Sequence, residues 1–139
     1  MSYLLDTNII SELVKKTPHP SVVKWIDGMD DEKLYISVIT LGEIRKGISG
    51  IQSLERQEKI SHWLEVELLA YFEERIVTID TKVADMWGRL QGNIKGYVLP
   101  AIDGLLAATA HVHSFTLVTR NTKDFIHTPI EIINPWEAL

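Results

Sequence analysis

Strand-like and helix-like segments alternate along the chain. Short runs rich in Val, Ile, Leu and Tyr fit strands, and longer segments with apolar residues three and four positions apart fit helices with one buried face. The predicted order is strand 2–6, helix 8–16, helix 20–28, strand 34–39, helix 40–49, helix 53–72, strand 75–79, helix 81–94, helix 101–113, strand 115–119 and strand 130–133. Alternation of this kind predicts an α/β fold with a mainly parallel sheet flanked by helices.

The length and composition of the chain fit one ordinary folded domain. It has 139 residues, of which 45% are hydrophobic and 24% are charged, enough to bury a core without disulfides or a structural metal. No apolar run approaches the roughly 20 residues that cross a bilayer, and no leader-like segment precedes the first strand. We therefore expect a single domain over 1–139, no membrane partner and a cytoplasmic location. Because cysteine is absent, thiol catalysis and thiolate metal sites are excluded.

Three acidic residues lie where predicted strands end or predicted helices begin. Asp6 follows the first strand, and Glu43 falls in the first turn of a helix that Thr40 opens in a capping-box pattern. Asp103 lies in the first turn of an Ala- and Leu-rich helix that follows Pro100, a residue suited to a helix start. Any one of them has a structural explanation, because an acid at a helix start gains about 0.3 to 1 kcal/mol from the helix dipole.

The shared location of these acids at one edge of the predicted sheet favours a metal site. Function in parallel α/β sheets concentrates outside the carboxyl ends of the strands, and Asn121 and Asp124 follow another strand toward the same edge. Two carboxylates about 4 Å apart repel by roughly 4 kcal/mol at an effective dielectric near 20, so a fold keeps them together only for a cation or a shared proton. Carboxylate oxygens suit Mg²⁺ and Mn²⁺. The histidines supply no zinc motif, since His111 and His113 are two residues apart and do not share a helical face.

Polar and basic residues adjoin the predicted site. Asn8 and Thr119 are suited to hydrogen-bond the ligating carboxylates and fix their rotamers, although Asn8 fits a helix cap equally well. The basic residues near this edge fit either contacts to a polyanion or an ordinary solvated surface: Arg45, Lys46, Arg120 and Lys123. The net charge of −5 argues against a nucleic-acid partner, but bound cations would offset the charge of clustered carboxylates.

Five motifs occur in a fixed order over essentially the whole chain. They are LLDTN at 4–8, SVITLGEI at 37–44, DGLLAATA at 103–110, LVTRNTKDF at 117–125 and NPW at 134–136. Together they resemble PIN-domain ribonucleases, and within that family the VapC and FitB toxins of toxin-antitoxin pairs. The resemblance assigns Asp6, Glu43 and Asp103 to an acidic metal-binding core. For the fourth acidic position it leaves open whether Asn121 or Asp124 takes the role, because some relatives have Asp where this chain has Asn121.

The resemblance also implies a fold, an activity and partners. It implies a three-layer α/β/α sandwich and Mg²⁺- or Mn²⁺-dependent endonucleolytic cleavage of RNA, with water activated by one or two ions and no side-chain nucleophile. It further implies a cognate antitoxin with a DNA-binding segment, and a homodimer that pairs again in the antitoxin complex.

Two alternatives compete with a nuclease. A receiver-like signalling domain is also a small α/β protein with acids at strand ends, but it needs an adjacent acidic pair after its first strand. This chain has Asp6 alone there, and Asp30 and Asp31 precede the next strand instead. A degenerate PIN-like domain that binds RNA or a partner without cutting is the other alternative, and the neutral Asn121 favours it.

Overall fold

Five short parallel strands form the centre of the molecule, and the structure, a computed structural model, describes residues 1–137. The strand order across the sheet is β3-β2-β1-β4-β5, and every neighbouring pair is parallel. The strands are β1 (Tyr3–Leu5), β2 (Leu34–Ser37), β3 (Ile76–Val77), β4 (Thr116–Val118) and β5 (Ile132–Ile133). In the central strand Tyr3 aligns with Leu34 on one side and with Thr116 on the other. The predicted parallel sheet is therefore confirmed.

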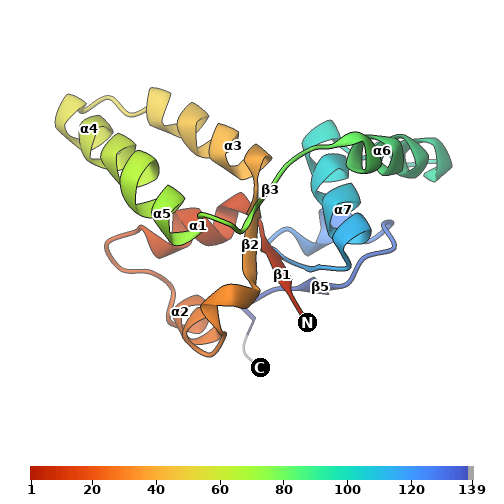
Figure 1. Cartoon of the computed structure of the whole chain (residues 1–139), viewed down its shortest axis with the longest axis horizontal. Coiled ribbons are helices and arrows are strands. Elements are labelled where there is room, and N and C mark those ends of the chain that lie inside the picture. The colour runs from red at the N-terminus through yellow and green to blue at the C-terminus, as the bar shows by residue number, and fades with distance from the viewer. Residues whose placement is uncertain (138–139) are drawn as a thin grey trace.

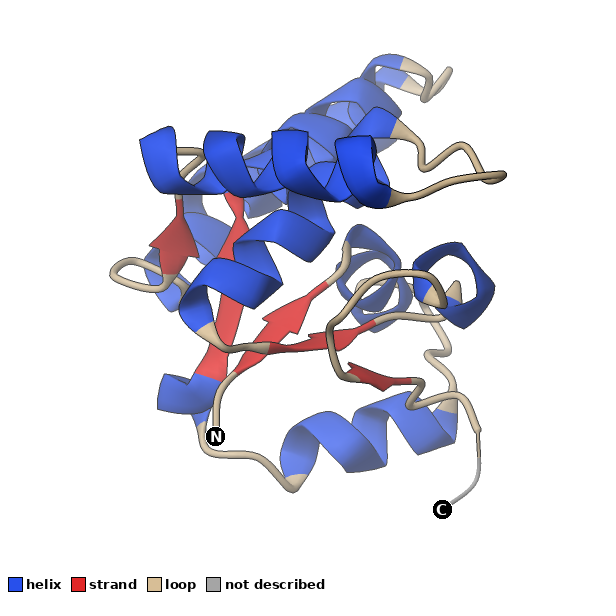
Figure 2. Ribbon diagram, turned by 90° about the vertical axis from the view of Figure 1, so that its right-hand side faces the viewer, coloured by secondary structure: helices blue, strands red, loops and turns tan. Residues whose placement is uncertain are grey.

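Helices cover both faces of this sheet, which makes three layers (Figures 1 and 2). One face packs against α1, α2, α3 and the arm formed by α4 and α5, and the other packs against α6 and α7. The helices are α1 (Thr7–Leu13), α2 (Pro20–Asp27), α3 (Val38–Ser49), α4 (Leu54–His62), α5 (Leu69–Tyr71), α6 (Thr81–Asn93) and α7 (Ala101–His113). Single 3-10 turns occupy Asp31–Lys33 and Thr122–Phe125.

Alternate residues of the strands supply the two cores. Leu5 and Val118 belong to the core under α1, α2 and α3, whereas Leu4 and Leu117 belong to the core under α6 and α7. All four side chains are at most 1% exposed. Because successive side chains of a strand point to opposite faces, continuous apolar runs are what a sheet covered on both sides requires.

The helix that carries Glu43 begins earlier than its sequence pattern predicted. Ser37 ends β2 and is the N-cap of α3, because its hydroxyl accepts a hydrogen bond from the Ile39 amide at 3.0 Å. Thr40 is fully buried inside the helix, where its hydroxyl oxygen lies 3.2 Å from that of Thr7. The prediction of Thr40 as the cap was therefore wrong, and Glu43 lies in the second turn of α3 rather than the first.

Other boundaries differ from the predictions by a few residues. Helix α1 begins at Thr7, because the Asp6 side chain caps it, so Asn8 is not the cap. The predicted helix 53–72 is helical, but Trp63–Leu68 within it is a π-helix, a local widening that is frequent at functional sites. Helix 101–113 has the predicted bounds. No helix within 1–137 is long and apolar enough to span a membrane.

A glycine lets α7 approach α6 closely next to Asp103. A Cβ atom built on Gly104 would lie 3.0 Å from Trp87 Cδ1 and 2.9 Å from Gln91 Nε2. The Gln91 side chain donates a hydrogen bond to the Leu99 carbonyl at 3.0 Å, which fixes the loop before α7. This packing places the first turn of α7 at the carboxyl edge of the sheet.

Candidate active site

Asp6 lies at the end of the central strand, where hydrogen bonds hold its side chain. It is 7% exposed, Oδ1 accepts from the Thr7 amide at 2.7 Å, and Oδ2 accepts from the Thr119 hydroxyl at 2.7 Å. Asn8 Nδ2 lies 3.5 Å from the same Oδ2 and 3.3 Å from the Thr119 hydroxyl. Burial raises the pKa of Asp6 above its ordinary value, and the bonds from Thr119 and Thr7 oppose that rise. Asn8 and Thr119 thus fix the orientation of the carboxylate.

Glu43 projects from α3 toward the start of α1. The Thr7 hydroxyl donates to Glu43 Oε1 at 2.5 Å, while the Thr7 amide donates to Asp6. Thr7 therefore joins two of the predicted acids, a role that the sequence alone did not assign to it. The only local signal is its position in the first turn of a helix directly after Asp6.

The pKa of Asp103 is raised by burial and by the negative charges of the other acids. This residue lies in the first turn of α7, and its pKa is raised from an ordinary 3.8 to about 6, first by burial and then by the charges of Asp124, Asp6 and Glu43. Since the Coulomb energy between two charges decreases with the distance between them, the side chains of these acids share one region. Asp124 contributes more to this effect than Asp6 or Glu43.

A cleft of about 340 Å³ brings the predicted site residues together. Its lining residues are Asp6, Thr7, Asn8, Ser11, Glu43, Ile102, Asp103, Leu106 and Asn121. The walls thus come from the carboxyl ends of β1 and β4 and from α1, α3 and α7. Of the two candidates for the fourth acidic position, Asn121 lines the cleft, and Asp124 follows it in a 3-10 turn.

The donor set of this cleft fits a hard divalent cation. Its acids offer carboxylate oxygens, and no cysteine exists in the chain to attract a softer metal. Burial first, and then the charges of Asp124, Asp6 and Glu43, raise the pKa of Asp103 to about 6, and a bound cation would relieve the part that comes from those charges. Within 1–137 no three acidic or histidine side chains are close enough together to hold one ion in the arrangement seen. Ligation by all three acids therefore requires their side chains to move toward one another.

The four basic residues near this edge differ in their surroundings. Arg45 donates to Glu65 at 2.8 Å and to Ser61 at 3.3 Å, so α4 and the π-helix engage it on the outer side of α3. Lys46 and Lys123 are exposed. Arg120 is exposed too, and its backbone amide donates to Asn8 Oδ1 at 3.4 Å. Arg120 is thus the basic residue with a direct link to the cleft wall.

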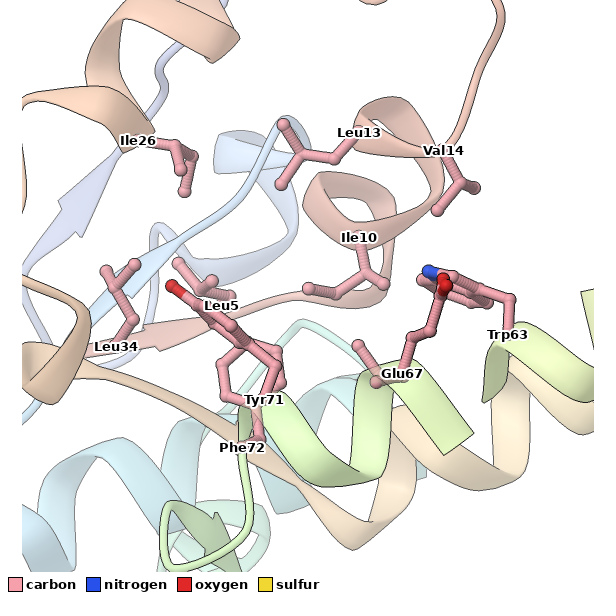
Figure 3. Close-up of a pocket in the computed structure, with 11 residues that line it drawn as sticks. Leu5, Ile10, Leu13, Val14, Ile26, Leu34, Trp63, Glu67, Tyr71 and Phe72 are labelled. Carbon is pink, nitrogen blue, oxygen red and sulfur yellow. The ribbon is translucent and has the colours of Figure 1, made fainter. Parts of the chain in front are cut away.

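A second concavity, which we call the apolar groove, lies between α1, α2 and the α4–α5 arm (Figure 3). Its volume is about 400 Å³, and its lining residues are Leu5, Ile10, Leu13, Val14, Ile26, Leu34, Trp63, Glu67, Leu68, Tyr71 and Phe72. Val14 and Tyr71 are 39% and 42% exposed. A smaller pocket shares Ile10, Val14 and Trp63 with the groove and shares Thr7, Ser11 and Glu43 with the cleft. The groove and the cleft therefore adjoin the same intermediate pocket, which reaches Glu43.

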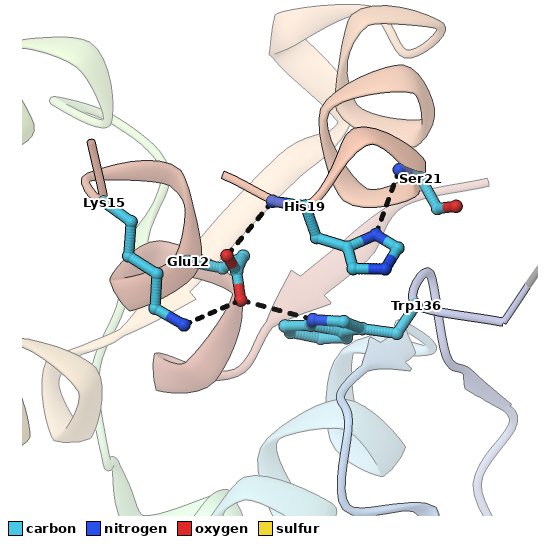
Figure 4. A network of polar contacts seen from close by, with 5 residues as sticks. All are labelled: Glu12, Lys15, His19, Ser21 and Trp136. Carbon is cyan, nitrogen blue, oxygen red and sulfur yellow. Dashed lines mark hydrogen bonds and ion pairs between the residues drawn. The ribbon is translucent and has the colours of Figure 1, made fainter. Parts of the chain in front are cut away.

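A buried acid on α1 forms a polar network that the sequence did not predict (Figure 4). Glu12 is 5% exposed and accepts hydrogen bonds from Lys15 Nζ at 3.1 Å, from the His19 amide at 3.1 Å and from Trp136 Nε1 at 3.3 Å. The bond from Lys15, more than any other contact, lowers the pKa of Glu12. A signal was available, because Glu12 lies three residues after Ile9 on the buried face of α1.

Comparison with known proteins decides the family of this fold and cleft. The model of the PIN domain matches residues 3–131. The chain is a PIN-domain protein. Toxin FitB of Neisseria gonorrhoeae is 36% identical over 135 residues, which cover 96% of this chain and 97% of that protein. The VapC ribonuclease Y4jK of Sinorhizobium fredii is 38% identical over 136 residues, again 96% of this chain and 97% of that one.

Solved structures agree with this assignment to the PIN-domain family. The crystal structure of FitAcB from Neisseria gonorrhoeae superposes with a TM-score of 0.93 at 36% identity, covering 98% of this chain and 99% of that one. The structure of FitAB bound to the IR36 DNA fragment gives a TM-score of 0.92 at 34% identity and covers 99% of this chain and 97% of that one. The three-layer α/β/α fold of this PIN-domain protein is thus shared along its length with solved relatives.

Proposed function

We propose that this PIN-domain protein is a metal-dependent endoribonuclease and the toxin of a toxin-antitoxin pair. The observation that carries the proposal is the cleft, in which Asp6, Glu43 and Asp103 come from separate segments of the chain to one edge of the sheet. Two close relatives, named a toxin and a VapC ribonuclease, support it. An RNA substrate fits a cytoplasmic location.

Asp6, Glu43 and Asp103 are the residues that would hold Mg²⁺ or Mn²⁺. A bound ion of this kind supplies an activated water and neutralises charge on the phosphodiester. Asp124 adds negative charge from behind the cleft wall, and Asn121 offers a neutral oxygen at the wall itself. Both remain candidates for the fourth position: Asn121 lines the cleft, and the charge of Asp124 acts on Asp103.

The surrounding residues hold these acids in place. Thr119 and Asn8 keep Asp6 Oδ2 directed by hydrogen bonds, and Thr7 fixes Glu43 Oε1. Buried hydroxyl and amide donors of this kind reduce the reorganisation that ligand binding requires. No side-chain nucleophile is needed, since water is the attacking group.

Replacing Asp6 with Asn tests the proposal. The substitution keeps the shape and one of the two acceptor oxygens but removes the charge, so RNA cleavage should be lost while the chain still folds. The matched control is Asp85→Asn on the exposed surface of α6, which should cleave as wild type does. Cleavage of labelled RNA is measured with EDTA, Mg²⁺ or Mn²⁺. Equal, metal-independent cleavage by wild type and Asp6→Asn would refute the proposal.

The apolar groove suits an antitoxin as partner. Its exposed Val14 and Tyr71 offer apolar surface to an amphipathic helix of another chain. Because the neighbouring pocket reaches Glu43, a segment that continues from the groove ends beside the carboxylates and blocks RNA. Val14→Glu should weaken association with the product of a small reading frame next to this gene, and Val98→Glu, at an exposed loop residue outside the groove, serves as control. Unchanged association of Val14→Glu would place the antitoxin elsewhere.

A catalytically inactive RNA-binding domain is the second candidate, and Asn121 favours it. This residue places a neutral amide at the cleft wall where some relatives carry an acid. RNA cleavage measured over a series of Mn²⁺ concentrations separates the two candidates, because an inactive domain binds RNA without cutting it at any Mn²⁺ concentration. We further propose that the chain forms one domain and a homodimer, which light scattering at several protein concentrations tests.

A further inference from the structure

The NPW motif at 134–136 contacts α1, one of the helices that line the candidate active site. Strand β5 ends at Ile133, whose carbonyl accepts a hydrogen bond from the Thr119 amide at 2.9 Å. The Asn134 side chain then accepts a hydrogen bond from the Trp136 amide at 2.9 Å, which turns the chain back. Trp136 thereby packs against α1 rather than leaving the fold.

Trp136 is held on two sides. Its Nε1 donates to Glu12, which is itself fixed by Lys15 and by the His19 amide (Figure 4). The guanidinium carbon of Arg120 lies 5.2 Å from the centroid of the Trp136 ring, within the range of a cation–π interaction. The indole ring thus connects a buried carboxylate to the guanidinium of Arg120.

Arg120 is also tied to the wall of the cleft. Its amide donates to Asn8 Oδ1 at 3.4 Å, and its neighbour Asn121 lines the cleft. Asn8 and Glu12 are four residues apart on α1, so they share a face with Cβ atoms about 5 to 6 Å apart. Trp136 therefore contacts α1 one helical turn from Asn8, which lines the cleft. No residue of 1–137 forms an ion pair with Arg120, so its charge is available to a ligand.

We propose that Trp136 is a positioning residue that holds the Arg120 guanidinium ready to contact an RNA phosphate next to the one in the carboxylate cleft. This inference rests on the proposed RNA substrate. Arginine suits phosphate because its planar fork donates two parallel hydrogen bonds. An exposed arginine loses side-chain freedom when it binds, and stacking on a fixed ring reduces that loss in advance. Arg45 is less suited to this role, because Glu65 and Ser61 already engage it.

Binding of RNA in a double-mutant cycle tests the proposal. The probe is a labelled mixed-sequence single-stranded RNA oligonucleotide, and all variants carry Asp6→Asn so that the probe stays intact. Trp136→Leu should raise Kd about two- to fivefold, the range of an exposed cation–π contact. Arg120→Ala should raise Kd at least as much and lower the salt slope by about 0.7 for one lost phosphate contact. In the Arg120→Ala background, Trp136→Leu should have no further effect.

A purely structural role of Trp136 gives a different result. In that case Trp136→Leu lowers the thermal midpoint and weakens RNA binding to the same extent with or without Arg120. Such additivity would overturn the proposal. If Trp136→Leu does not fold, Arg120→Lys supplies the second test, because it keeps the charge but loses the planar stack. Arg120→Lys should raise Kd about two- to fivefold with an unchanged salt slope, and binding equal to wild type would overturn the proposal.

The same measurements separate this inference from the proposed function. A chain with the native Asp6 that binds RNA but does not cut it refutes the nuclease, and the coupling between Trp136 and Arg120 still decides the positioning role. A chain that cuts RNA but shows no coupling refutes only the positioning role. Failure to bind RNA overturns both.

Discussion

Replacing Asp103 with Asn should stabilise the metal-free protein at neutral pH. Asp103 has a folded-state pKa of about 6 against an ordinary 3.8, so the folded state holds its proton more tightly than the unfolded state. The contribution of protonated Asp103 to the free energy of unfolding is therefore fully present below pH 4 and is lost as the pH rises to about 6. Each pKa unit corresponds to about 1.4 kcal/mol, which gives about 3 kcal/mol without screening. Because the side chain is only half-buried, solvent reduces this penalty to about 1 kcal/mol.

Thermal unfolding in EDTA measures this effect. At pH 7.5 Asp103→Asn should unfold about 4 °C above wild type, the shift that about 1 kcal/mol produces in a domain of this size. At pH 4 the two proteins should unfold together, because wild-type Asp103 is then protonated. The control Asp85→Asn removes an acid that pairs with Arg89 at 2.8 Å, so it should give no stabilisation at either pH.

Addition of Mn²⁺ should reverse the order of the two midpoints. An ion that binds only the folded state stabilises it, and wild type offers the ion one more carboxylate than Asp103→Asn. If Asp103→Asn is no more stable than wild type in EDTA at pH 7.5, neither burial nor the neighbouring charges destabilise ionised Asp103, and the electrostatic reasoning for the site is wrong.

Further predictions concern Thr119 and the glycines of α6 and α7. Thr119→Val should reduce RNA cleavage about 10- to 100-fold, because it removes the donor that orients Asp6, and Thr119→Ser should retain cleavage; equal rates for both variants would contradict this. Gly104→Ala should cost about 1 to 3 kcal/mol in chemical denaturation, because the new methyl group meets Trp87 at 3.0 Å. Gly88→Ala, whose Cβ would meet nothing within 4 Å, should instead stabilise the protein by about 0.5 to 1 kcal/mol; a stable Gly104→Ala variant would show that α6 and α7 can separate without cost.

Local sequence patterns predicted the elements and hence the edge at which the acids meet. Asp6 and Asp103 lie where their flanking strand and helix signals placed them. Glu43 reached the cleft although its predicted cap was wrong, since a helix that begins two residues earlier still carries it along the same wall. The periodicity of apolar residues therefore constrained the site more strongly than the capping pattern did.

Contacts between distant residues could not be predicted in this way. Thr7 bonds to Glu43 across 36 positions, and Trp136 bonds to Glu12 across 124. Neither partner carries a local signal for the other, because the meeting depends on how the strands are ordered in the sheet. The contact between Arg120 and Trp136 likewise depends on the turn after β5, which the sequence pattern did not predict.

The hydrogen bond between Asp6 and Thr119 joins residues 113 positions apart. Strand β1 lies between β2 and β4, so its second neighbour is synthesised only after β2, β3 and α7. A ribosome that carries an unfinished copy of this protein therefore carries an incomplete sheet and an Asp6 without its main donor. The carboxylate at the centre of the cleft is therefore held in its orientation only once β4 has joined the sheet.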